Sequence, residues 1–307
     1  MTEIIRARNL VKRYDGFTAV DGIDFSVRKG ECFGFLGPNG AGKTTTVRMI
    51  SCVSPVTEGE LAVDGVDVWR EPRRIKSILG VVPQEDNLDP DLSVRQNLAV
   101  YARYFDMPRE LADQRIDESL VLFQLVDKQN EPIAALSTGL KRRLTIARGL
   151  INQPKILVLD EPTTGLDPQA RHMVWQKLRY LKEQGVTMLL CTHYMEEAAH
   201  LCDRLVIMHQ GRILVEGSPA ELVEEYVGRE VAEVQASGRQ RERILTDVAS
   251  RTGLTVEEVE DIIYIHTRTP DGRAQMADLI RDSDKVVYRP ANLEDVFLRL
   301  TGRGLIE

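Results

Sequence analysis

Short apolar runs alternate along most of the chain with longer stretches in which apolar residues recur every three or four positions. The short runs are residues 4–7, 23–27, 32–36, 80–82, 156–159 and 186–191. The stretches with helical spacing are residues 44–51, parts of 93–124, 141–151, 172–184 and 195–202. Apolar strands alternating with helices are typical of a mainly parallel sheet covered on both faces, so we expect an α/β fold.

The pattern changes toward the C-terminus. Residues 204–208 and 212–215 flank Gln210-Gly211 like the two arms of a hairpin, and the composition shifts after Tyr226. From there the segments with strand or helix character are residues 231–235, 239–249, 256–259, 262–267, 275–280 and 286–288, with a last helix at 293–300. This β-α-β-β-α-β order predicts a second, small α+β domain of the ferredoxin-like type.

Composition narrows the class of protein. The chain has 307 residues, 43% of them hydrophobic, and a net charge of −7, which argues against a nucleic-acid-binding surface. No apolar run approaches the ~20 residues that span a bilayer, and no apolar secretory segment follows the first residues. The four cysteines are far apart and form no C-x-x-C pair, as expected of reduced thiols in the cytosol.

A glycine-rich segment joins the strand at 32–36 to the helix at 44–51. It consists of Gly37, Pro38, Asn39, Gly40, Ala41, Gly42, Lys43 and Thr44. The segment fits G-x-x-x-x-G-K-[ST], in which backbone N–H groups and a helix N-terminus surround phosphates. Lys43 would then bring its charge to the γ-phosphate, Thr44 its hydroxyl to Mg²⁺, and Thr45 would contact the α- or β-phosphate. The alternative is a glycine turn that binds nothing.

Two acidic residues, Asp160 and Glu161, end the apolar strand at 156–159. Ligands of a doubly wound sheet bind at the carboxyl ends of its strands. We therefore expect Asp160 to hold Mg²⁺, through water, and Glu161 to orient and polarise an attacking water. Adjacent acids at such a place also serve as helix N-caps, but the phosphate-binding segment favours the catalytic interpretation.

Residues 136–140, Leu-Ser-Thr-Gly-Leu, lie upstream of Asp160 and resemble the LSGGQ signature of the ABC superfamily. Further segments resemble the other markers of that superfamily, in the same order. They are Tyr14 for the A-loop, Gln84 for the Q-loop, residues 165–167 with Asp167 for the D-loop, and His193 for the switch histidine. The resemblance covers residues 3 to about 220 and implies an ABC-type P-loop ATPase.

The resemblance implies a role for each marker. Tyr14 would stack on adenine, Gln84 would contact Mg²⁺ or the water, and His193 would bond the γ-phosphate and hold the water of Glu161. Ser137 and Gly139 would face a γ-phosphate across a dimer, with Asp167 nearby. Thr138 and Leu140 depart from LSGGQ, where the family has Gly and Gln.

Within the superfamily, residues 136–144, 194–198 and 292–302 are similar to the ATPases of ABC-2-type exporters. These include the daunorubicin-type drug exporters and the Nod-factor (lipo-chitooligosaccharide) exporters. This similarity implies an antiparallel N-terminal β part, a helical subdomain at about 85–135 and a nucleotide-binding domain over residues 1–225. Residues 226–307 would form an accessory or regulatory domain.

The resemblance also implies the cofactors and partners. ATP and Mg²⁺ would be used by a homodimer of nucleotide-binding subunits at the inner face of the cell membrane, held there by an ABC-2-type permease. The alternative from another class is a soluble ABC ATPase that acts on nucleic acid or the ribosome. The single P-loop, the acidic net charge and the lack of a long heptad run argue against it. Import in place of export stays open. A purely regulatory ATP sensor would lack Lys43 or Glu161, and because both are present the sequence argues against this third alternative.

Overall fold

The computed structural model describes residues 2–251, 253–269, 272–281 and 285–301. The chain divides into two compact units, Met1–Ile213 and Leu214–Glu307. Among the described residues, no helix combines the length and the apolar composition that crossing a membrane requires. We describe each unit by itself.

A six-stranded sheet forms the centre of the first unit, in the order β10-β9-β3-β8-β7-β6. Its strands are β3 (Cys32–Leu36), β6 (Leu79–Val82), β7 (Ile156–Asp160), β8 (Thr187–Thr192), β9 (Arg204–His209) and β10 (Arg212–Gly217). The neighbouring strands from β9 to β6 are all parallel. Every residue of β3, β7 and β8 is buried, as expected of apolar strands covered on both faces, and the predicted α/β fold is confirmed.

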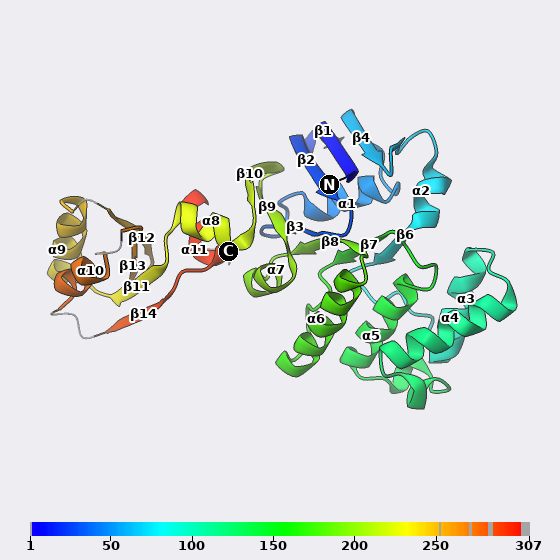
Figure 1. Ribbon diagram of the computed structural model, residues 1–307. Coiled ribbons are helices and arrows are strands. Elements are labelled where there is room, and N and C mark those ends of the chain that lie inside the picture. The colour runs from blue at the N-terminus through cyan, green and yellow to red at the C-terminus, as the bar shows by residue number, and fades with distance from the viewer. Residues whose placement is uncertain (1, 252, 270–271, 282–284, 302–307) are drawn as a thin grey trace. The chain divides into compact units, whose positions relative to one another are not determined.

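Helices and an antiparallel sheet cover the two faces of this sheet. Figure 1 shows α5 (Thr138–Gly149), α6 (Pro168–Glu183) and α7 (Met195–Leu201) on one side and α1 (Lys43–Ile50) on the other. The antiparallel sheet has the order β2-β1-β4-β5, with β1 at Glu3–Tyr14, β2 at Phe17–Arg28, β4 at Glu58–Val63 and β5 at Val66–Asp67. Between the two sheets, the ring of Phe35 packs edge to face against Phe25 and Phe33, whose own rings are stacked.

Several elements of this unit differ from the sequence-based expectation. Strands β1 and β2 are longer than the runs at 4–7 and 23–27 that predicted them. Register shifts in their pairing interrupt the alternation of buried and exposed positions, so the sequence pattern reveals only part of each strand. Strands β4 and β5 and helix α2 (Pro72–Ile78) were not predicted. Residues 93–124 form two helices, α3 (Val94–Tyr104) and α4 (Arg109–Leu122), followed by the 3-10 turns η1 (Val126–Lys128) and η2 (Ile133–Ala135).

Helices α5 and α6 begin earlier than residues 141 and 172, where their apolar spacing begins. Ser137 caps α5 by accepting a hydrogen bond from the Leu140 amide at 3.4 Å. Asp167 caps α6 by accepting one from the Ala170 amide at 2.9 Å, and Pro168 occupies the first turn. A capping side chain fixes a helix start that hydrophobic spacing alone does not reveal.

The second unit contains α8 (Pro219–Tyr226), β11 (Glu230–Gln235), α9 (Gly238–Ala249), β12 (Leu254–Val259), β13 (Ile262–Thr267), α10 (Gly272–Leu279), β14 (Val286–Pro290) and α11 (Leu293–Thr301). Its sheet has the order β12-β13-β11-β14, and all neighbouring strands are antiparallel. This is the predicted ferredoxin-like arrangement. Buried side chains of α9, α10 and the sheet form a separate apolar core. Gly302, the last residue of the exporter-like ending, lies outside the described residues.

Candidate functional site

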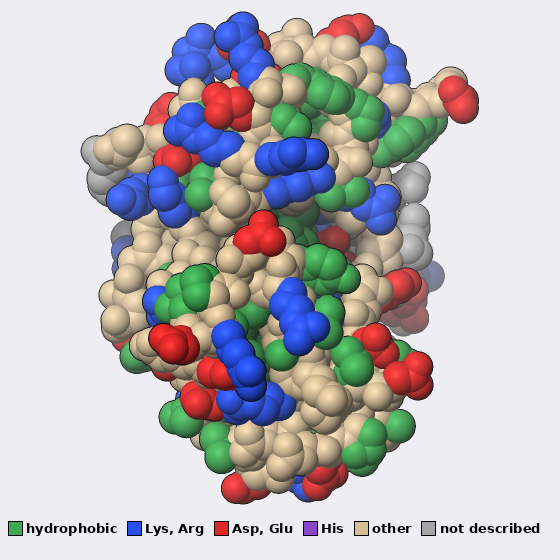
Figure 2. Space-filling view, turned by 90° about the vertical axis from the view of Figure 1, so that its right-hand side faces the viewer, with side chains coloured by type: hydrophobic (Ala, Val, Ile, Leu, Met, Phe, Trp, Pro, Cys, Tyr) green, Lys and Arg blue, Asp and Glu red, His purple; other side chains and the backbone are tan. Residues whose placement is uncertain are grey.

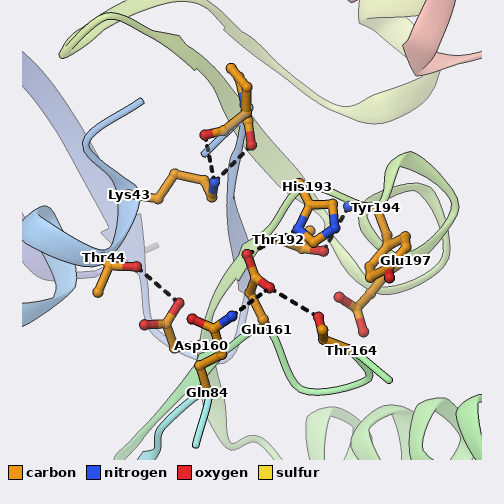
Figure 3. Close-up of polar contacts among 12 residues, drawn as sticks. Lys43, Thr44, Gln84, Asp160, Glu161, Thr164, Thr192, His193, Tyr194 and Glu197 are labelled. Carbon is orange, nitrogen blue, oxygen red and sulfur yellow. Dashed lines mark hydrogen bonds and ion pairs between the residues drawn. The ribbon is translucent and has the colours of Figure 1, made fainter. Parts of the chain in front are cut away.

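Four neighbouring strands of the parallel sheet end side by side, and each leads into a predicted site segment. The register places Leu36 beside Thr192 and Asp160 beside Cys191, while Val82 pairs with Leu159. The glycine-rich segment, His193, the acidic pair and Gln84 therefore leave the sheet at one edge. Figure 3 shows their side chains converging there. Of the residues expected at the site, the structure brings Lys43, Thr44, Gln84, Asp160, Glu161 and His193 together.

The glycine-rich segment is shaped by close backbone approach. A Cβ on Gly37 would lie 2.2 Å from the Met208 carbonyl oxygen, and one on Gly42 would lie 2.6 Å from the Ala19 carbonyl oxygen. Gly42 also has a φ of 102°, a conformation that favours glycine. The segment between them curls ahead of the N-terminus of α1, so the chain here can surround an anion with backbone amides.

Lys43 lies inside this curled segment, and its side chain is directed back toward it. Its Nζ donates hydrogen bonds to the carbonyl oxygens of Gly37, at 2.7 Å, and Pro38, at 2.9 Å. The residue is 5% exposed, and burial lowers the pKa of its ammonium group. The carbonyls compensate this buried charge in part, and the acids Glu161 and Asp160 oppose the lowering of the pKa.

Thr44 and Asp160 form a pair of oxygen donors beside Lys43. The Thr44 hydroxyl donates to Oδ1 of Asp160 at 3.3 Å. Burial raises the pKa of Asp160, and the hydrogen bond from Thr44 opposes this shift. A hydroxyl and a carboxylate close to a phosphate-binding loop suit Mg²⁺, which prefers oxygen ligands and takes several of them from phosphate and water. These residues therefore fit the metal.

Glu161 is the centre of the polar contacts in Figure 3. Its Oε2 accepts hydrogen bonds from Gln84 Nε2 at 3.2 Å and from the Thr164 hydroxyl at 3.0 Å. Its Oε1 lies 2.9 Å from Nδ1 of His193. The residue is 6% exposed and has a φ of 47°, which is unusual for a residue with a side chain. Three segments of the chain thus orient one carboxylate.

Two buried charged residues beside this centre were missed by the sequence analysis. Arg142 on α5 is 3% exposed and donates to backbone carbonyls around the acidic pair. Glu197 on α7 accepts from the Thr163 hydroxyl at 2.6 Å and from the Trp175 indole N–H at 3.2 Å. Burial raises the pKa of Glu197. Their only sequence signal is their place in segments 136–144 and 194–198, which the sequence analysis used to assign a subfamily.

Tyr14 lies at the end of β1, in the antiparallel sheet, and so does not follow one of the parallel strands that lead to the other residues. The residue is 44% exposed. The hydroxyl lies 3.3 Å from Ser54 Oγ, and the Lys12 ammonium lies 4.7 Å from the ring centre. The ring is accessible to a planar partner, as stacking on adenine would require.

Ser137, Gly139 and Asp167 are brought together in a different place. They line a surface hollow between the N-terminal ends of α5 and α6. All its lining residues come from segments 137–143 and 165–173. The close approach of Gly139 to α6, where an added Cβ would lie 3.3 Å from the Ala170 Cβ, keeps the two helix starts adjacent. Within one chain, this hollow is separate from the glycine-rich segment.

Comparison with protein families gives two matches. Residues 20–164 match the ABC transporter family. Residues 239–302 match the family described as Nodulation factor export protein NodI, C-terminal domain. The two matches fall in the two parts of the chain that the sequence analysis had separated.

Comparison with curated proteins gives relatives that are similar over the whole chain. A Nod factor export ATP-binding protein I from Ralstonia nicotianae is 46% identical over 310 residues, covering 99% of this chain and 95% of that protein. One from Cupriavidus metallidurans is 43% identical over 308 residues, covering 99% of both.

Solved structures resemble the first unit. The cbiO1 protein of Clostridium perfringens, part of the ABC transporter complex cbiONQ, is 28% identical with a TM-score of 0.67, covering 72% of this chain and 91% of that one. A dimeric ATP-binding cassette in a post-hydrolysis state, bound to ADP and Pi, is 28% identical with a TM-score of 0.64, covering 70% and 98%. Together with the full-length relatives, these matches show that the chain belongs to the ABC transporter family, as one of its ATP-binding and ATP-hydrolysing export subunits.

Proposed function

We propose that this chain is the ATPase of an exporter for lipo-chitooligosaccharides of the Nod-factor class. The cargo would cross the membrane through a separate ABC-2-type permease. The observation that carries the cargo class is the similarity outside the ATPase core. Residues 239–302 match a C-terminal domain named for nodulation factor export, and a relative named for that export aligns with 99% of this chain. The subunit would then work at the cytoplasmic face of the membrane.

For hydrolysis, we propose that the amides of residues 37–42 and the Lys43 ammonium bind the phosphates. Lys43 would exchange its two carbonyl partners for phosphate oxygens. Thr44, Asp160 and Gln84 would hold Mg²⁺, which neutralises phosphate charge. Glu161 would accept a proton from the attacking water, while Gln84 and His193 keep its carboxylate oriented. Tyr14 would stack on adenine.

We propose further that two copies of the chain complete each site. Ser137, Gly139 and Asp167 line a hollow that is built from α5 and α6 alone. The hydroxyl and helix N-terminal amides at that hollow suit an anion. A head-to-tail dimer would bring the hollow of one chain to the phosphate-binding segment of the other, forming two equivalent sites.

For the permease, we propose a contact on the helical region, at residues 85–135 and the elements beside it. A groove there is lined by Val53, Arg73, Lys76, Leu79, Tyr101 and Tyr104. Val53 is 69% exposed and Tyr104 is 76% exposed. On the side of the first unit toward α2, α3 and α4, hydrophobic side chains lie next to Lys and Arg side chains (Figure 2). Exposed apolar side chains with basic neighbours suit a helix that carries both apolar and acidic residues.

The cargo can be tested with the permease that co-purifies with this chain, reconstituted in vesicles. We expect a lipo-chitooligosaccharide to stimulate ATP hydrolysis, and the same oligosaccharide without its acyl chain to stimulate it less. Daunorubicin serves as the competing cargo class, and the Glu161→Gln variant provides the background rate. Stimulation by daunorubicin alone would refute the proposed cargo and leave the ATPase assignment in place.

A further inference from the structure

Arg142 makes more hydrogen bonds to the site than the residues expected there from the sequence. Its Nε donates to the Pro162 carbonyl at 2.6 Å. One terminal nitrogen donates to the carbonyls of Pro83, at 2.6 Å, and Gln84, at 3.3 Å. The other donates to the carbonyls of Asp160 and Glu161, both at 3.0 Å. The guanidinium therefore joins three segments, namely α5, the start of the Gln84 loop and the acidic pair.

The charge of Arg142 is buried, and among the described residues its guanidinium bonds main-chain carbonyls and no carboxylate. The residue is 3% exposed, and burial lowers the pKa of its guanidinium. Four acids oppose this shift from a distance, namely Asp86, Glu197, Asp160 and Glu161. A buried guanidinium satisfied by main-chain oxygens is costly to remove, because the carbonyls then lose their donors. Lysine cannot replace it, because a single ammonium group lacks the planar fork that reaches several acceptors at once.

The backbone that Arg142 holds is unusual. Glu161 has a φ of 47°, in the left-handed region. One terminal guanidinium nitrogen donates to the carbonyls on both sides of the Glu161 Cα, those of Asp160 and Glu161. These two hydrogen bonds hold the backbone of Glu161 in this conformation. A left-handed backbone in a residue with a side chain persists only where its surroundings enforce it. The direction of the Glu161 side chain follows from this backbone rotation.

We propose that Arg142 is a positioning residue for hydrolysis. It fixes the backbone of Glu161 so that the carboxylate meets Gln84, Thr164 and His193, and it ties the start of the Gln84 loop and helix α5 to that arrangement. A movement of either segment would then turn the carboxylate. The inference rests on the proposed role of Glu161 in activating water.

The test compares Arg142→Met and Arg142→Lys with a matched control. Arg204→Met removes another largely buried arginine, one that bonds Glu31 at 3.0 Å and lies outside the site. We expect both Arg142 variants to lower kcat about 100-fold, the order of loss that follows a small displacement of a catalytic group. The KM for ATP should change less than about threefold, because no phosphate contact is lost. The Arg204→Met variant should lower the melting temperature without lowering kcat at a temperature where it is folded.

A double variant separates positioning from general damage. Adding Arg142→Met to Glu161→Gln should lower the residual hydrolysis rate by less than about threefold, because both changes disable the same carboxylate. If the double variant shows the product of the two single-variant losses in rate, the inference is overturned. A folded Arg142→Met variant with normal kcat would also overturn it. If Arg142→Met does not fold, Arg142→Gln gives the same comparison with two donors retained. Normal hydrolysis by Glu161→Gln would instead refute the proposed role of Glu161 in activating water.

Discussion

The carboxylate of Glu161 and the imidazole of His193 meet at 2.9 Å, Oε1 to Nδ1, although the two residues follow different strands. Strands β7 and β8 are neighbours, and their parallel pairing brings both strand ends to one edge of the sheet. The other oxygen of the same carboxylate contacts Gln84 and Thr164. The position of Glu161 is therefore determined by the order of the strands and by the polar side chains that follow them.

The first prediction concerns the charge of Glu161. Glu161→Gln preserves the size of the side chain but removes the base that would take a proton from water. We expect ATP binding to persist and turnover to fall at least about 100-fold, the scale of general base catalysis. Sedimentation with and without MgATP should then show a dimer that forms only with nucleotide. A variant that hydrolyses ATP at the parent rate would assign the base to another residue.

The second prediction compares two glycines of the phosphate-binding segment. A methyl group at Gly37 would meet the Met208 carbonyl at 2.2 Å, whereas nothing lies within 4 Å of one at Gly40. Gly40 has a φ of 80°, so alanine there costs about 1–2 kcal/mol of conformational energy. Gly37→Ala must move backbone, and we expect it to lower the melting temperature more than Gly40→Ala, both measured without nucleotide. Equal melting temperatures would mean that the segment yields easily at Gly37.

Residues with a local sequence pattern were found from the sequence alone. Lys43, Thr44 and the acidic pair follow or adjoin an apolar strand, and the order of strands and helices places them at one edge. Their contacts in the structure agree with that placement. The ferredoxin-like order of the second unit was predicted on the same ground, since each of its segments has the period of its own element.

Residues that act through the main chain could not be found in this way. Arg142 bonds only carbonyl oxygens in the contacts described here, and every residue type carries those, so no side-chain pattern marks its partners. Oε1 of Glu197 accepts hydrogen bonds from Thr163 and Trp175, which lie 34 and 22 positions away in the sequence. Such pairings depend on how helices α5, α6 and α7 pack against the sheet, which hydrophobic periodicity does not specify.

The third prediction concerns the second unit. Its apolar core is formed by residues between 232 and 286. Helices α8 and α11, which lie outside that range, pack against each other. A chain ending at Gly217 should therefore fold and bind ATP with an affinity close to that of the full chain. A chain ending at Glu225 keeps most of α8 but lacks α11, so Leu222, which is buried in the full chain, would become exposed. Its melting temperature should therefore be lower than that of the chain ending at Gly217. Loss of ATP binding in a folded chain ending at Gly217 would contradict the expectation that the second unit is an accessory domain outside the nucleotide site.

The last prediction concerns the shared site. Lys43 lies in the phosphate-binding segment, whereas Ser137 lines a hollow made only of residues 137–143 and 165–173. If each site combines Lys43 of one chain with Ser137 of the other, Lys43→Ala and Ser137→Arg should each be inactive as homodimers. In their heterodimer, one site carries both lesions and the other carries neither.

Mixing the two inactive variants should therefore restore part of the ATPase activity. The restored activity should rise with total protein concentration, because dimers form by mass action.

Mixing each variant with Glu161→Gln tests the pairing further. Glu161 is expected to serve the same site as Lys43, so Glu161→Gln should complement Ser137→Arg but not Lys43→Ala. Should properly folded heterodimers of Lys43→Ala and Ser137→Arg remain inactive, either the sites are not shared in this way or both must be intact for either to hydrolyse ATP.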